Sequence, residues 1–330
     1  MTEPVSTSNG LDLFKKIKVL NELLWEYRAD LPSVQQWLRN FSGSHTLQDA
    51  EQRHALYLLS RFLYYGSPEI RVLLRSMFQD LVRHPLTIKA RTSVSDPNDF
   101  DRIHQAFETE LASTRFIGLG NPAESSTHIL YDFRLANSLP IEYFLVFHEL
   151  FSGALNAKDT EWADPGVTRI IFIDDFCGTG TQATDVASKY LPVVRQAALR
   201  SQIVIEVWYL TMLGTTAGLA RVRAAGRFDC VSAVSELDDT YRAFGPDSQL
   251  FMNPPPGIEA TVAEEVSRHY GGTLVPDHPL GYENSQLLLG FSHNVPDNTL
   301  PIFWAGASPG HPWSPIFPRI SKLSVAGGAL

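Results

Sequence analysis

The stretch from residue 167 to residue 185, VTRIIFIDDFCGTGTQATD, constrains the fold more than any other part of this chain. Residues 170–173 form an apolar run of β-branched and aromatic type, which predicts a buried strand. Two adjacent acids follow, then a loop of small and hydroxyl residues, and then a predicted helix over residues 182–191. A strand, a glycine-bearing turn and a helix start gather backbone N–H groups at one point, which is how proteins hold phosphate.

The two acids before this loop are Asp174 and Asp175. Their charge would repel a ligand that consists of phosphate alone. A ligand that also carries hydroxyl groups or a divalent cation satisfies them, because hydroxyls donate charge-assisted hydrogen bonds to carboxylates. A sugar phosphate has both kinds of group, so this stretch predicts a sugar-phosphate site.

Composition narrows the class of protein. The chain has 330 residues, of which 44% are hydrophobic and 19% charged, as in ordinary globular domains. Its net charge of −9 argues against an extended nucleic-acid surface. No signal peptide and no apolar run near membrane length is apparent, so we expect a cytoplasmic protein without a membrane partner. The two cysteines, Cys177 and Cys230, form no metal or disulfide motif.

The layout of the chain predicts two parts. Residues 1–85 show helical periodicity throughout and predict an all-α extension, which we interpret as a packing or partner-docking module. Its last helix begins at Ser67 and ends at Pro85. Residues 86–330 begin with a polar connector and then alternate strands with helices, which predicts a mainly parallel sheet flanked by helices. The predicted strands cover residues 115–119, 142–147, 170–173, 203–212, 228–234, 285–291 and 301–304.

Two other classes of nucleotide-binding protein have sequence motifs that are similar to parts of this chain. The chain contains no G-x-x-x-x-G-K-[ST] sequence, so a nucleotide-hydrolase P-loop is excluded. An S-adenosylmethionine-dependent aminomethyltransferase remains an alternative interpretation, because FCGTGT and the later Asn253-Pro-Pro-Pro resemble two motifs of these enzymes. Against it, Pro256 cannot stack on a flipped base, and the strand after the loop carries its acid, Glu206, in mid-strand.

The motif most closely resembles that of type I phosphoribosyltransferases. Their signature is four apolar residues, two acids, two apolar residues, a small residue and then T-G-x-[TS], and IIFIDDFCGTGTQ follows it up to its last place. There Gln182 stands instead of a hydroxyl residue. The order of the neighbouring elements also fits, with a loop at residues 120–126 after the first strand and a mobile loop at residues 148–166 before the motif.

This resemblance implies roles for individual residues. Asp174 and Asp175 would take the ribose hydroxyls of phosphoribosyl pyrophosphate, with Mg²⁺ bridging the ligand and these acids as its candidate protein ligands. Lys158, in the mobile loop, would close over the pyrophosphate, or is an exposed solubilising lysine. The 5′-phosphate would lie in the loop of Gly178, Thr179, Gly180, Thr181 and Gln182, and the pyrophosphate against Ser125, Ser126 and Thr127, of which the last two are equally candidates for a helix N-cap.

The C-terminal part, about residues 240–330, resembles that of phosphoribosyltransferase-like proteins from bacterial conflict, or anti-phage defence, elements, which also carry an α-helical N-terminal part. The resemblance makes this part the acceptor side of the pocket, although His293 is equally a candidate for a structural histidine. Its candidate residues are Tyr282, Asn284, His293, Asn298 and Trp304. The implied reaction is displacement of pyrophosphate at the anomeric carbon. A module that binds the ribose phosphate without transferring it, as a sensor, is the alternative.

Overall fold

The computed structural model describes residues 8–120, 125–152, 160–307 and 311–319. The chain forms two compact units. Unit 1 combines residues 1–68 with residues 238–330, and unit 2 consists of residues 69–237. The predicted boundary after residue 85 therefore lies inside unit 2, and the predicted N-terminal extension shares a unit with the C-terminal part of the chain.

Unit 2 is built on a four-stranded sheet. Its strands are β2 (Thr114–Gly118), β5 (Arg169–Cys177), β6 (Glu206–Thr215) and β7 (Cys230–Leu237). They lie in the order β2-β5-β6-β7, and every neighbouring pair is parallel. Gly118 pairs with Ile173, and Asp174 pairs with Thr211. Because parallel strands end at the same edge of a sheet, the segments that follow β2, β5 and β6 meet there.

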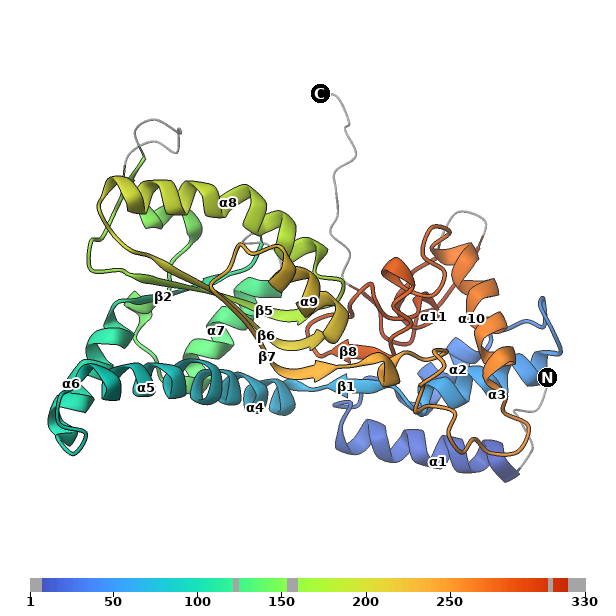
Figure 1. Ribbon diagram of the computed structural model, residues 1–330. Helices are drawn as coiled ribbons and strands as arrows, with labels where there is room; N and C mark the ends of the chain where they lie inside the picture. Colours follow the sequence, from blue (N-terminus) through green and yellow to red (C-terminus); the bar gives the residue numbers. More distant parts are fainter. Residues whose placement is uncertain (1–7, 121–124, 153–159, 308–310, 320–330) are drawn as a thin grey trace. The chain divides into compact units, whose positions relative to one another are not determined.

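Helices cover both faces of this sheet (Figure 1). One face carries α8 (Thr181–Arg200) and α9 (Thr216–Ala224), and the other carries α4 (Ser67–Phe78), α5 (His84–Ser93) and α7 (Ser125–Asn137). Ile170 and Phe172 of β5 share a core with Ala183, Ala187 and other apolar residues of α8. The predicted α/β class with a mainly parallel sheet is confirmed. α6 (Phe100–Ala112) packs against α5.

The predicted polar connector at residues 87–95 is wrong, because most of it belongs to helix α5. Pro85 does not end the preceding helix. A π-helical turn, η1 (Gln79–Arg83), joins α4 to α5, and the proline lies in the first turn of α5.

The predicted strand at residues 142–147 is also wrong. Two short 3₁₀ turns, η2 (Ile141–Tyr143) and η3 (Phe147–Leu150), occupy its ends. Between them Phe144 makes one isolated parallel bridge to Phe116 of β2. The predicted mobile loop that follows contains a small antiparallel pair, β3 (Phe151–Ser152) with β4 (Glu161–Trp162). Lys158 lies outside the described residues.

Ion pairs stabilise the buried start of β5. Arg169 is fully buried, and its guanidinium donates to Glu206 at 2.8 Å and to Glu110 at 2.9 Å. Lys89 bridges the same two acids. Glu206 was predicted in mid-strand, but it is the first residue of β6 and lies at the edge opposite the motif. Its carboxylate therefore serves this ion-pair network.

Unit 1 is joined across its two chain segments. Its described elements are α1 (Ser8–Leu23), α2 (Leu31–Leu38), α3 (Gln48–Leu59), β1 (Leu63–Tyr65), α10 (Ala260–Leu274), η4 (Asp239–Tyr241), η5 (Tyr282–Asn284), β8 (Leu289–Phe291) and α11 (Pro301–Trp304). β1 and β8 form a parallel pair, so the predicted strand at residues 285–291 is present in part. The predicted strand at residues 301–304 is wrong, because Pro301 opens a helical turn.

Buried polar groups also join these segments. Glu51 is fully buried, and its carboxylate accepts hydrogen bonds from the Tyr270 hydroxyl and from the N–H groups of Gly43, His45 and Thr46. The N–H group of Glu259 donates to the His54 ring at 3.0 Å. No helix among the described residues is both long and apolar enough to cross a membrane.

Candidate functional site

The two motif acids lie at the C-terminal end of β5, where the strand runs into the loop. Asp174 is 7% exposed, whereas Asp175 is partly exposed. The carboxylate of Asp174 accepts the Tyr209 hydroxyl at 2.8 Å and the Asp175 N–H at 3.0 Å. The Asp175 carboxylate accepts the N–H of Phe176 at 2.9 Å. The neighbouring carboxyls therefore have different environments.

Burial raises the pKa of the Asp174 carboxyl well above its usual range, and the adjacent Asp175 charge raises it further. Burial likewise raises the pKa of Tyr209 well above its ordinary value, and that of the Cys177 thiol to about 12. A low-dielectric environment favours the neutral form of each group. Asp175 is thus the acid better suited to present a charge to a ligand.

The loop after the acids turns at Gly180, whose φ of 76° lies in the left-handed region. Gly180 is the N-cap of α8, and this helix has no side-chain cap hydrogen bond. The hydroxyls of Thr179 and Thr181 lie 3.0 Å apart. The predicted loop thus joins a helix start to two adjacent hydroxyl groups, which are donors suited to a phosphate.

The start of α9 packs directly against this loop, and the sequence prediction missed it. The Thr215 hydroxyl donates to the carbonyl of Gly178 at 2.5 Å and accepts from the N–H of Gly218 at 2.9 Å. A Cβ on Gly218 would lie 2.1 Å from the same carbonyl oxygen. Arg221, one turn further along α9, donates to the Thr181 hydroxyl at 2.8 Å. The available signal was that β6 also ends at this edge.

The predicted pyrophosphate loop begins at the same edge of the sheet. Leu119, directly after β2, donates its N–H to the carbonyl of Ile173 at 3.0 Å. Gly120 follows with a φ of 99°. Residues 121–124 lie outside the described part. The backbone of Ser125, Ser126 and Thr127 begins α7, and their side chains lie outside the description.

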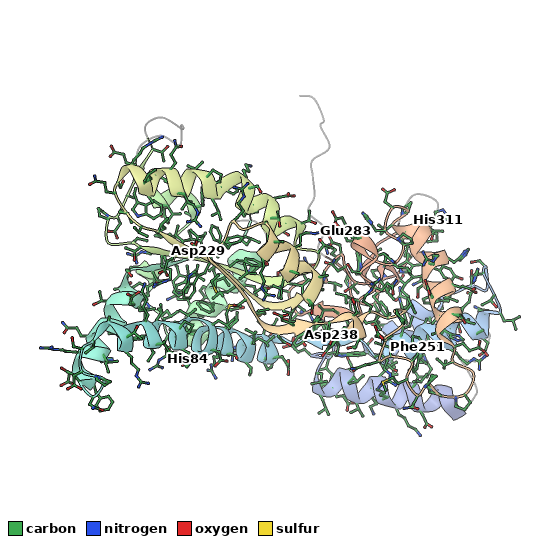
Figure 2. All side chains as sticks on the ribbon, in the orientation of Figure 1. His84, Asp229, Asp238, Phe251, Glu283 and His311 are labelled. Atoms are coloured by element: carbon green, nitrogen blue, oxygen red, sulfur yellow. The ribbon has the colours of Figure 1, made fainter. Side chains whose placement is uncertain are left out.

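The acceptor-side candidates belong to unit 1. Tyr282 and Asn284 lie in a short segment whose residues Glu283, Asn284 and Gln286 all have positive φ. Asn298 is buried and donates to the Ser285 hydroxyl at 2.8 Å. Figure 2 labels the exposed Glu283 in this segment. The structure thus brings three of the five candidates into one region of unit 1.

The other two candidates have packing contacts. The His293 ring stacks on Phe291 with centroids 5.3 Å apart. Trp304 donates its ring N–H to the carbonyl of Thr299 at 2.7 Å and packs against the core of unit 1. Arg319 lies over the Trp304 ring.

No group of three or more His, Cys, Asp or Glu side chains within the described ranges has an arrangement that would hold a metal ion. Mg²⁺ commonly binds through one or two carboxylates together with substrate phosphates and water. Asp175, at the end of β5, fits this kind of site, because its partly exposed carboxylate lies beside the predicted phosphate loop.

The parallel sheet and the acid–glycine loop define a phosphoribosyltransferase-like protein. A family model described as PRTase-CE matches residues 34–319, and the chain belongs to this family. No curated protein matches the chain. An orotate phosphoribosyltransferase from Aeropyrum pernix is a structural neighbour with 20% identity and a TM-score of 0.23. The match covers 42% of this chain and 72% of the orotate phosphoribosyltransferase chain. The AQ2163 protein from Aquifex aeolicus is a second structural neighbour, with 10% identity and a TM-score of 0.27. The match covers 63% of this chain and 86% of the AQ2163 chain. The assignment rests on the family match.

Proposed function

We propose that this chain binds phosphoribosyl pyrophosphate, or a related ribose phosphate, at the C-terminal edge of β5. The observation that carries the proposal is the position of the acids and the phosphate-type loop at the two ends of one short turn. Asp175 is at one end, and the start of α8 with its threonine hydroxyls is at the other. A ribose 5-phosphate presents hydroxyls and a phosphate to these two ends.

The two acids have separate tasks in this proposal. Asp175 accepts the ribose hydroxyls as a carboxylate. Asp174, which Tyr209 and the backbone already engage, supports the turn from beneath and contributes to the ribose pocket as a second, more buried acceptor. Asp175 is the candidate carboxylate that would hold Mg²⁺, which would offset the negative charge of the pyrophosphate.

The reaction is displacement at the anomeric carbon. The bond from C1 to the pyrophosphate oxygen breaks, and a bond from C1 to the acceptor forms while the acceptor loses a proton. The electron pair of the broken bond leaves with pyrophosphate. Positive charge develops on the sugar in between, and a carboxylate beside the ring stabilises it. The remaining contribution of the protein is to position both partners.

Calorimetric titration with phosphoribosyl pyrophosphate, with and without Mg²⁺, tests binding. We expect micromolar affinity that Mg²⁺ strengthens. Asp175→Asn removes the charge without changing the shape, so it should weaken binding about 10- to 100-fold. Asp185→Asn is the matched control, because Asp185 is exposed on α8 and should leave the affinity unchanged. Binding of S-adenosylmethionine in place of the ribose phosphate would contradict the proposal.

A pyrophosphate-release assay separates transfer from binding. Transfer predicts pyrophosphate release that depends on an added base, nucleotide or macromolecule and is lost in Asp175→Asn. Tight binding without release across these acceptors would instead favour a sensor. The departure at Gln182, where the signature has a hydroxyl residue, is the reason for this second outcome.

A role in anti-phage defence is the further part of the proposal, and it is supported by the resemblance of the outer segments to conflict-element proteins. Cells that carry the gene should then show fewer plaques than cells that carry the Asp175→Asn form at equal protein level. Equal plaque numbers in the two strains would remove the defence role and leave the ligand proposal intact.

A further inference from the structure

One arginine from the next helix reaches the proposed phosphate loop. Arg221 lies on α9, and its Nη1 atom donates to Thr181 Oγ1 at 2.8 Å. Thr181 Oγ1 lies 3.0 Å from Thr179 Oγ1. A guanidinium has only donors, so the threonine oxygen must accept from it. One of the two hydroxyls uses its hydrogen on the other, so the guanidinium and one hydroxyl hydrogen are the donor groups of this line along the start of α8.

The position of the helix that carries this guanidinium is fixed by main-chain contacts with the loop. The carbonyl of Gly178 accepts from the Thr215 hydroxyl, which is the N-cap of α9. A Cβ on Gly180 would lie 2.4 Å from the carbonyl oxygen of Gly218, so the loop and α9 touch through their main chains. Arg221 follows one turn later on the same helix. The loop and the main chain at Arg221 are thus held together, and the hydrogen bond to Thr181 directs the guanidinium to the start of α8.

The N-terminus of α8 and the Arg221 guanidinium both favour an anion at this end of the loop. The acids stand at the other end of the turn, and the residue at the last place of the signature, Gln182, carries no hydroxyl. Arginine matches the planar oxygen pairs of phosphate with two parallel N–H groups. We propose that Arg221 binds the 5′-phosphate of the ligand and selects phosphorylated over unphosphorylated sugars.

This inference rests on the proposed function and assigns the proposed site its phosphate-selecting side chain. A purely structural role for Arg221, as a brace for Thr181, makes a different prediction. A brace would stabilise the loop for every ligand, whereas a phosphate-binding residue acts only on ligands that carry the phosphate. The neighbouring Arg223 supplies the comparison, since it pairs with Glu236 at 2.9 Å and with the carbonyl of Val231.

The test compares full-length wild type with Arg221→Gln, Arg221→Lys and the control Arg223→Gln. The probes are phosphoribosyl pyrophosphate, ribose 5-phosphate, inorganic phosphate and unphosphorylated ribose, measured by calorimetry, with phosphorus NMR line broadening for those that carry phosphate. We expect Arg221→Gln to weaken ribose 5-phosphate and inorganic phosphate by about 10- to 100-fold, and Arg221→Lys to recover part of the loss. Arg223→Gln should stay within about twofold of wild type, as expected for an exposed ion pair away from the ligand.

A second readout is the salt dependence of affinity. The difference between wild type and Arg221→Gln should shrink as ionic strength rises, because salt screens an exposed charge–charge contact. Equal loss at all ionic strengths, or equal loss for unphosphorylated ribose, would overturn the inference in favour of a brace.

The possible failures are distinguishable. If wild type binds ribose 5-phosphate and Arg221→Gln binds it equally, the inference is wrong and the proposed function stands. If wild type binds inorganic phosphate through Arg221 but neither sugar phosphate, the proposed function is wrong and the anion role of Arg221 stands. If wild type binds none of the probes, both are overturned.

Discussion

Asp174 and Asp175 are neighbours in sequence, yet the fold places their side chains in different surroundings. The signature treats the two acids alike, and nothing in their residue type or spacing distinguishes them. The difference comes from Tyr209, which lies on the adjacent strand β6 and covers Asp174 while donating to it. Side-chain environment of this kind depends on strand register, which residue spacing within one segment does not contain.

The first prediction at this scale concerns pH. The folded-state pKa of Asp174 is raised above its unfolded value, mainly by burial. Its contribution to stability is therefore fully present below the unfolded pKa and is lost as pH rises through the folded pKa. Asp174→Asn keeps a neutral group here, so its melting temperature should exceed that of wild type by about 2–4 °C near neutral pH.

Thermal unfolding followed between about pH 4 and pH 8 measures this difference, which should grow with pH. Asp185→Asn, at an exposed position of α8, should have the same melting temperature as wild type across this pH range. An Asp174→Asn protein that melts lower than wild type at every pH would show that the carboxyl is ionised and stabilising in the folded state.

At the scale of elements, the strand, loop and helix of the motif were predicted correctly, because a long apolar run and a glycine turn are strong local signals. The helix extends further than predicted, to Arg200, and contains Pro192. The short apolar runs at residues 142–147 and 301–304 were wrongly predicted to be strands, since periodicity cannot distinguish a short strand from a helical turn. The docking of α9 on the loop was missed because it depends on two glycines, Gly178 and Gly218, that are far apart in sequence.

Replacing one helix glycine should therefore separate the loop from α9. In Gly218→Ala the new Cβ would lie 2.1 Å from the Gly178 carbonyl oxygen, so main chain must move. We expect destabilisation of about 1–3 kcal/mol, as for overpacked sites, together with weaker ribose-phosphate binding. Chemical denaturation and calorimetry measure the two effects.

Gly272→Ala is the matched control in this experiment. Gly272 also lies in a helix, α10, but the nearest atom to its added Cβ is the Pro279 side chain at 4.0 Å. The free energy of unfolding of this variant should rise by up to about 1 kcal/mol, because alanine has a higher helix propensity than glycine, and the variant should bind ligand as wild type does. Similar stability of the two alanine variants would show that α9 can shift to accommodate the added methyl group without loss of folding free energy.

At the scale of the whole molecule, the sequence predicted the α/β class but not the partner of the N-terminal helices. Helical periodicity shows that a face is apolar without showing what covers it. The covering residues come from the far end of the chain. Trp37 donates its ring N–H to the carbonyl of Ile302, and Phe62 stacks on Phe317 with centroids 4.6 Å apart.

Fragments of the chain test this organisation. Unit 2 is one continuous segment with its own sheet and core, so residues 69–237 should fold alone and keep the ribose-phosphate site. Residues 1–68 alone should remain largely unfolded, because β1 loses β8 and the aromatic core loses half its members. Joining residues 1–68 to residues 238–330 through a flexible linker should restore cooperative unfolding by circular dichroism. A cooperative transition in residues 1–68 alone would contradict this division.

The parallel pairing of β1 with β8 also sets an order of events during synthesis. Leu63 pairs with Leu289, so the strand nearer the start of the chain must wait for more than two hundred further residues before its partner leaves the ribosome. Unit 2 lies wholly between these strands and is complete earlier. Domains generally fold as units while the chain is being made. A nascent chain whose residue 237 has just left the ribosome would therefore already hold the phosphate loop, with an unfinished apolar segment on its N-terminal side as a substrate for chaperones.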